Sequence, residues 1–151
     1  DGISLKRSEQ LKPLSHEHHH ALFIAKRLRD EGEEAITAFA EFWRSEGELH
    51  FRIEEEVLLP GSGLGGPGED ADVARMLDEH LDIRRRVRRV LEGEATSREL
   101  NELGTALTEH VRFEERTLFP RIEALLDEAA LDDLATRILR AEVRPRGGTD
   151  E

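Results

Sequence analysis

The sequence predicts an all-α fold, an antiparallel up-and-down four-helix bundle with a short C-terminal helix. Apolar residues recur with helical spacing in four long segments, and no segment alternates polar and apolar residues as a strand would. Short turns and one glycine-rich loop separate these segments. Helices joined in this way pack as antiparallel neighbours, so a bundle is the expected architecture.

Serine, glycine and proline mark the ends of the predicted helices. Ser15 follows Pro13 and is an N-cap candidate for the first helix. The loop GSGLGGPGED (61–70) divides the chain into two halves, and Pro60 and Pro120 are expected to end the segments before them. The four helices are predicted over residues 15–30, 33–59, 70–92 and 97–119.

The C-terminal part of the chain predicts shorter elements. RIEALLDE (121–128) indicates a brief helical continuation, and an amphipathic piece covers about residues 130–142. We expect one domain over residues 1–142, because a chain of this length buries roughly two-thirds of its unfolded surface without a cross-link. PRGGTDE closes the chain, and residues 143–151 are predicted to form a flexible tail.

The composition argues against several classes of function. Thirty-four acidic residues against 22 basic ones give a net charge of −12, which argues against nucleic acid as the main partner. The absence of cysteine excludes disulfides, thiolate metal sites and a cysteine nucleophile. No apolar run approaches the roughly 20 residues of a membrane span, and the N-terminal residues lack the apolar core of a signal peptide. We therefore expect a cytoplasmic protein that binds no membrane.

One stretch of sequence occurs twice. HFRIEEEVLLP (50–60) returns as HVRFEERTLFP (110–120). In both copies a histidine is followed four residues later by a glutamate, and then by an apolar pair and a proline. Residues four apart on a helix are neighbours on its surface, so each His–Glu pair can reach one point in the interior.

Every predicted long helix places one histidine on its apolar face, and the second and fourth helices add a glutamate one turn further on. His18 and His80 lie 62 residues apart, and His50 and His110 lie 60 apart. The two halves are therefore pseudo-repeats whose polar residues would meet across an approximate two-fold axis. The six candidate metal ligands are His18, His50, Glu54, His80, His110 and Glu114.

Two carboxylates and four imidazoles on apolar faces need a compensating charge. A buried ionised carboxylate is costly unless it is paired or bound to a metal, and no lysine lies on these faces. Two divalent cations would satisfy all six groups, and imidazole with carboxylate suits iron, manganese, zinc or copper. Each glutamate could then bridge two ions about 3.5–4 Å apart. A single histidine on an apolar face is more often a hydrogen-bonded core residue, but four in matching positions favour a metal site.

The stretch HEHHH places four histidines within five residues. Only His18 shares its helical phase with the apolar residues of the first helix. His16, His19 and His20 are therefore interpreted as residues of the surface or of the outer part of the site. A shift of register that makes His19 the ligand is the main alternative.

Charged residues beside the candidate ligands are interpreted mainly as facing solvent. Glu55, Glu56 and Glu115 lie off the inward faces, which favours a solvated surface over a role in orienting a ligand histidine. Arg84 is an exception among the neighbouring arginines. It follows His80 by four residues, so it can point toward the site.

Four stretches, taken in order, resemble those of hemerythrin-like proteins, the family built on the HHE cation-binding domain. They are LSHEHHHAL (14–22), HFRIEEEVLLP (50–60), DEHLDIRRRV (78–87) and EHVRFEERTLFP (109–120). The resemblance covers about residues 11–128 and implies an up-and-down four-helix bundle around a non-haem di-iron centre. It implies two iron ions joined by an oxo or hydroxo bridge, held by the six candidates, with Glu54 and Glu114 as bridging carboxylates.

The sequence departs from the oxygen-carrying hemerythrins at two positions. Arg84 stands where they have a second histidine on the third helix, and Glu115 stands where they have an aspartate on the fourth. Glu114, which lies four residues after His110, is taken as the counterpart of that aspartate. Both departures count against reversible oxygen carriage and favour a more open coordination sphere. The chain has no tyrosine, which excludes a phenolate ligand.

The resemblance implies a protein that binds O2 or NO at the di-iron centre for sensing, scavenging or storage. An apolar lining suits such a diatomic ligand, and Gly47, one turn before His50, leaves room for access. The expected lining residues are Leu22, Ala25, Trp43, Val57, Leu77 and Leu107.

The alternative is a di-iron redox enzyme, either peroxidase-like or catalase-like and acting on peroxide, or NO-reducing. It ranks second because such chemistry needs a proton donor near the metals, and Arg84 cannot readily give up a proton. A metal-buffering protein that holds zinc is a third possibility. The sequence identifies no protein partner.

Overall fold

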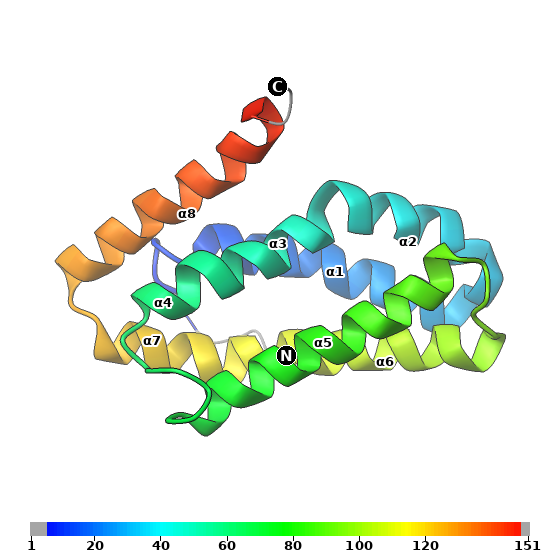
Figure 1. Ribbon diagram of the computed structural model, residues 1–151, viewed down its shortest axis with the longest axis horizontal. Coiled ribbons are helices and arrows are strands. Elements are labelled where there is room, and N and C mark those ends of the chain that lie inside the picture. The colour runs from blue at the N-terminus through cyan, green and yellow to red at the C-terminus, as the bar shows by residue number, and fades with distance from the viewer. Residues whose placement is uncertain (1–5, 149–151) are drawn as a thin grey trace.

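The computed structural model describes residues 6–148, with side chains up to residue 143. Within this range the chain is helical and contains no strand, which confirms the predicted all-α class. None of the described helices combines the length and the apolar character that a membrane span requires. Figure 1 shows most of the helices lying along one another, with the last helix leaving them at an angle.

The described residues form eight α-helices. They are α1 (Lys12–Glu31), α2 (Ile36–Phe42), α3 (Glu48–Ile53), α4 (Leu59–Gly61), α5 (Ala71–Leu91), α6 (Ser97–Phe113), α7 (Phe119–Leu125) and α8 (Glu128–Gly148). The 3-10 turn η1 (Gly32–Ala35) connects α1 to α2, and the π-helical turns η2 (Trp43–Gly47), η3 (Glu54–Leu58) and η4 (Glu114–Leu118) join the helices on either side of them without a break. Residues 36–61 and 97–125 are therefore continuous helical segments.

Local sequence explains where three of the helices begin. α1 begins at Lys12 rather than at the predicted Ser15, because the fixed φ of Pro13 suits the first turn of a helix. The Asp70 side chain caps α5 by accepting hydrogen bonds from two backbone N–H groups. Thr96 is the N-cap of α6 and forms a capping box with Glu99, three residues later.

The two prolines do not end their helices, contrary to the expectation from sequence. Pro60 lies in α4 and Pro120 in α7, and each follows a π-helical turn. The residue before each proline donates its N–H to the carbonyl of Glu54 or Glu114, five residues back. The register of the hydrogen bonds shifts at this turn, so the missing N–H of proline falls where the ladder is already interrupted. The helix can therefore continue.

Two apolar clusters fill the interior, and a polar layer separates them. The first cluster draws mainly on α1, α2, α5 and α6, and the second on α4, α7, α8 and the other ends of α1 and α5. Along α1 and α5 the buried apolar residues before a candidate ligand belong to the second cluster, and those after it belong to the first. On α1, for example, Leu14 belongs to the second cluster and Ala21 to the first, with His18 between them. Apolar side chains therefore enclose the candidate ligands on both sides.

α8 is longer than the short C-terminal helix that the sequence predicts. It spans Glu128–Gly148 instead of about 130–142. The segment 143–151 predicted as a tail is thus helical at its start, and its last three residues lie outside the described part. Leu134 and Ile138 are buried in the second apolar cluster, so the packing of α8 extends that cluster beyond the long helices.

Gly104 allows α6 to approach α1 closely. A Cβ atom added there would lie 2.6 Å from the carbonyl oxygen of Ala25 and 2.7 Å from Cγ of Arg29. Because a helix backbone cannot move aside easily, Gly104→Ala should lower the free energy of unfolding by about 1–3 kcal/mol in urea titrations. Gly68→Ala is the matched control, since nothing lies within 4 Å of the added atom. Equal stability of the two variants would contradict this account of the packing.

Candidate metal centre

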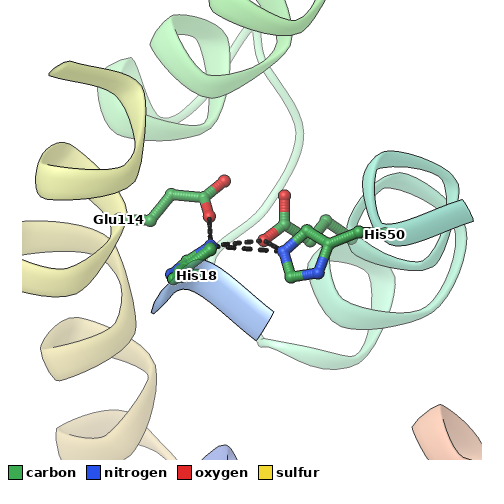
Figure 2. Close-up of side chains that lie close together, drawn as sticks. His18, His50 and Glu114 are labelled. Atoms are coloured by element: carbon green, nitrogen blue, oxygen red, sulfur yellow. Dashed lines mark hydrogen bonds and ion pairs between the residues drawn. The ribbon is translucent and has the colours of Figure 1, made fainter. Parts of the chain in front are cut away.

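Six buried side chains converge in the polar layer. Their exposed fractions range from 0% to 8%. Figure 2 shows three of them, from α1, α3 and η4, pointing toward one another. The structure thus brings together the full set of candidates taken from the sequence, namely His18, His50, Glu54, His80, His110 and Glu114.

The four histidines form two pairs. His18 Nε2 lies 3.2 Å from His50 Nε2, and His80 Nε2 lies 3.1 Å from His110 Nε2. In a tetrahedral zinc site, metal–nitrogen distances of about 2.0–2.1 Å place two nitrogen ligands about 3.3 Å apart. The separation within each pair is close to that of two ligands of one ion.

Glu54 and Glu114 lie between the two pairs, and each presents one oxygen to each pair. Glu54 Oε2 lies 2.8 Å from His50 Nε2, and its Oε1 lies 3.1 Å from His80 Nε2. Glu114 meets the other histidine of each pair, at 3.0 Å through Oε1 and at 2.9 Å through Oε2. Two groups of four possible ligand atoms result, and both carboxylates belong to both groups.

Each histidine also has an outer carboxylate on its other ring nitrogen. An ionised carboxylate only accepts hydrogen bonds, so Nδ1 must carry a proton, which leaves Nε2 for a metal ion. The four contacts are His18–Glu115 (2.6 Å), His50–Glu17 (2.6 Å), His80–Glu55 (2.6 Å) and His110–Glu79 (2.7 Å).

Two of these four outer carboxylates were expected to face solvent, and the other two were not predicted. The expectation that Glu55 and Glu115 face solvent is wrong, whereas Glu56 is exposed as predicted. Glu17 and Glu79 were not identified. The available signal was their position, because each directly precedes a candidate histidine in its half of the chain.

The cluster shifts the pKa values of its own members. Burial opposes ionisation of Glu54 and Glu114, but the surrounding imidazoles outweigh it and lower the pKa of both carboxyls. Burial alone would lower the pKa of His50, yet the charge of Glu54 and hydrogen bonds to carboxylates raise it to about 9. The pKa values of the other three histidines rise for the same kind of reason, also against burial. In the metal-free protein the surroundings therefore favour ionised carboxylates and protonated histidines.

Glu114 indicates that protein atoms alone do not complete the cluster. Both of its carboxylate oxygens are buried, and neither makes an oriented hydrogen bond within the described part of the chain. Imidazole nitrogens lie 2.9–3.0 Å away but are not directed for such a bond. A cation between these nitrogens and oxygens would remove the cost of the unsatisfied carboxylate. Imidazole and carboxylate donors fit two ions of iron, manganese, zinc or copper.

A small apolar cavity lies against three of the histidines. Its volume is about 20 Å³, enough for roughly one water-sized molecule. Trp43, Leu107 and Gly47 line it, as the sequence analysis expected. A Cβ at Gly47 would lie 2.6 Å from Cε3 of Trp43, so the indole fills the room that glycine leaves. Four other predicted lining residues pack with the apolar clusters instead, namely Leu22, Ala25, Val57 and Leu77.

The HEHHH stretch presents one histidine to the cluster. His18 is 2% exposed, whereas His16, His19 and His20 are on the surface. His20 pairs there with Glu46 at 2.9 Å. His19 therefore does not face the cluster, contrary to the alternative register.

The match to a known family agrees with this geometry. The family described as hemerythrin HHE cation binding domain matches residues 8–122, a range that includes all six converging residues. No curated protein and no solved structure matches the chain. A cation-binding family accounts for the two buried groups of His and Glu and for Glu114, whose carboxylate oxygens make no hydrogen bond among the described residues. Since the match covers most of its length, the chain belongs to the hemerythrin HHE cation-binding domain family.

Proposed function

We propose that the protein binds two non-haem iron ions and takes O2 or NO at this centre, for sensing, scavenging or storage. The observation that carries the proposal is the position of Glu54 and Glu114, each of which presents one oxygen to each histidine pair. Carboxylates in such positions can bridge two ions about 3.5–4 Å apart. Membership of a cation-binding family supports the same conclusion.

In this proposal each ion has two histidine ligands and shares both glutamates. His18 and His50 would hold one ion, and His80 and His110 would hold the other, and the family resemblance implies an oxo or hydroxo bridge between the two ions. We also propose that residues 1–142 form a single domain with an up-and-down four-helix bundle. Ligands on α1, α3, α5 and α6 meet in one layer, which supports that arrangement.

The donor set alone does not choose among iron, manganese, zinc and copper. The resemblance to hemerythrin-like proteins favours iron, which when bound supplies redox chemistry and a coordination position for a diatomic ligand. The chain itself holds the imidazoles through their outer carboxylates and encloses the layer with apolar side chains.

The cavity supports a small uncharged ligand. It lies against His18, His50 and His110, and its remaining walls are largely apolar, including Phe51 and Leu107. A volume of about 20 Å³ accepts a diatomic molecule and excludes a bulky substrate. An apolar enclosure also limits the access of water and protons to a bound ligand.

A di-iron redox enzyme remains the alternative function. Such chemistry needs a proton donor close to the metals. Glu55 and Glu115 lie near the cluster, but hydrogen bonds to histidine and arginine outweigh burial and lower the pKa of both carboxyls. Ionised carboxylates accept protons rather than donate them, so gas binding is favoured.

Metal content and an absorption spectrum test the proposal directly. Protein reconstituted with iron should contain two irons per chain and show near-ultraviolet bands that bleach on anaerobic reduction and return in air. Zinc in the purified protein, or no bound metal after iron reconstitution, would contradict a di-iron function. Colourless zinc protein would support metal buffering instead.

Replacing Glu54 or Glu114 with alanine should remove bound metal, because each carboxylate faces both histidine pairs. A metal ion that binds only the folded protein adds about 2.7 kcal/mol to the free energy of unfolding when its concentration is 100 times the dissociation constant. Thermal melts of the two alanine variants should not show this gain. Glu56→Ala and His16→Ala are exposed controls that should keep both metal and gain. Metal lost from His16→Ala but kept by Glu114→Ala would show that the ligand assignment is wrong.

Metal uptake should release protons and strengthen as the pH rises. In the metal-free protein the pKa of His50 is about 9, because the charge of Glu54 and hydrogen bonds to carboxylates outweigh burial. A proton on Nε2 competes with the metal, so zinc affinity should increase as the pH rises from 7 to 9. Calorimetry at pH 7 in buffers of different ionisation enthalpy counts the released protons. Affinity independent of pH, without proton release, would contradict this charge state.

A further inference from the structure

Two arginines occupy equivalent places behind the two histidine pairs, although they come from unrelated parts of the sequence. Arg84 lies on α5, one turn after His80. Arg7 lies in the segment before α1, just outside the family match, which begins at residue 8. Arg7 is buried, and Arg84 is partly buried.

Arg84 belongs to a closed unit of four side chains around His80. Its Nη1 donates to Glu55 Oε2 at 2.6 Å, and the same oxygen accepts from His80 Nδ1 at 2.6 Å. The guanidinium also lies over the ring of Phe51, 5.4 Å from its centroid. Phe51 stacks on the His80 imidazole, with 3.7 Å between the ring centroids and 3° between the planes. Arg84 therefore contacts both the outer carboxylate and the phenylalanine ring that pack against this histidine.

Arg7 forms the same unit around His18. Its Nη2 donates to Glu115 Oε1 at 3.0 Å, and Glu115 Oε2 accepts from His18 Nδ1 at 2.6 Å. The guanidinium lies 5.4 Å from the centroid of Phe119, which stacks on His18 at 5.5 Å and 15°. Arg7 also donates to the backbone carbonyl of Glu115 and to the hydroxyl of Ser15. The segment before α1 is thus anchored to the site.

The other histidine of each pair lacks this complete unit among the described residues. His110 has Glu79 and, behind it, Arg75 at 2.8 Å, but no phenylalanine stacks face to face on its ring. Glu17, the outer carboxylate of His50, makes no ion pair with a lysine or arginine among the side chains described up to residue 143. The complete unit therefore occurs once in each half of the site.

We propose that Arg7 and Arg84 are the positioning residues of the two halves of the metal centre. Each fixes, through an outer carboxylate and a phenylalanine ring, one histidine of its pair. The restrained carboxylate holds the proton on Nδ1, and this directs Nε2 toward the metal. Arg84 is then neither a spare ligand nor a proton donor. The inference rests on the proposed metal site.

Zinc binding followed by NMR tests the two halves separately, because zinc is diamagnetic and leaves the ring N–H signals of histidine observable. Arg84→Met should lower the affinity for one of two zinc ions, by less than the roughly 10–100-fold that is usual when the carboxylate partner itself is lost. It should also shift or broaden the Nδ1–H signal of His80 and leave that of His18 unchanged. Arg7→Met should give the converse result.

Conservative and control variants separate positioning from general stability. Arg84→Lys and Arg7→Lys keep the charge and should recover part of the lost affinity and the ring N–H signal. Arg85→Met and Lys6→Met alter exposed neighbours and should behave as the parent. If Arg7→Met does not fold, Arg7→Lys and the Arg84 variants still decide the question.

The outcomes distinguish this inference from the proposed function. A parent protein that binds neither zinc nor iron would refute the metal site itself. If the parent binds two zinc ions and Arg84→Met matches Arg85→Met in affinity and spectrum, the positioning role is refuted. Equal weakening of both ions, with both ring N–H signals lost, would indicate a general structural role and would also overturn the inference.

Discussion

The burial of two carboxylates, Glu54 and Glu114, is the constraint on which the rest of the structure depends. Neither has any exposed surface, and ionised groups are stable in an apolar interior only when opposite charge meets them. Imidazolium groups supply this charge in the metal-free protein, and two cations would supply it in the metal-bound form. The enclosing apolar clusters keep water from these groups, while the outer glutamates fix the imidazoles that face them.

The π-helical turns η3 and η4 each provide two neighbouring glutamates to the cluster. Each of η3 and η4 begins at a buried carboxylate, and the next residue, Glu55 or Glu115, supports a histidine from another helix. In an α-helix consecutive residues point about 100° apart, which is why these two glutamates were expected to face solvent. A wider turn rotates less per residue, so both neighbours can reach the site. The proline at the same position in the two repeated stretches, 50–60 and 110–120, is the sequence feature that corresponds to this turn.

Sequence periodicity predicted the helices and which six polar residues point inward, because both depend on spacing within one helix. It could not identify Glu17 and Glu79, since these act on histidines 33 and 31 residues away on other helices. Arg7 contacts Glu115 across 108 residues, a pairing that no local pattern encodes. The apolar face of a helix indicates which side chains point inward, but it does not indicate what lies opposite them.

The two halves of the site match in their carboxylates but not in the arginines behind them. Both halves take their inner and outer carboxylates from matching sequence positions, because a shared pair of ions would fix those distances closely. The arginines need only reach an outer carboxylate, and one comes from α5 while the other precedes α1. Among the four histidines, His50 is held least firmly from outside, because the side chain of its partner Glu17 is 35% exposed. The cavity contacts His50 together with His18 and His110, so under the proposed function a diatomic ligand would lie beside ligands of both ions.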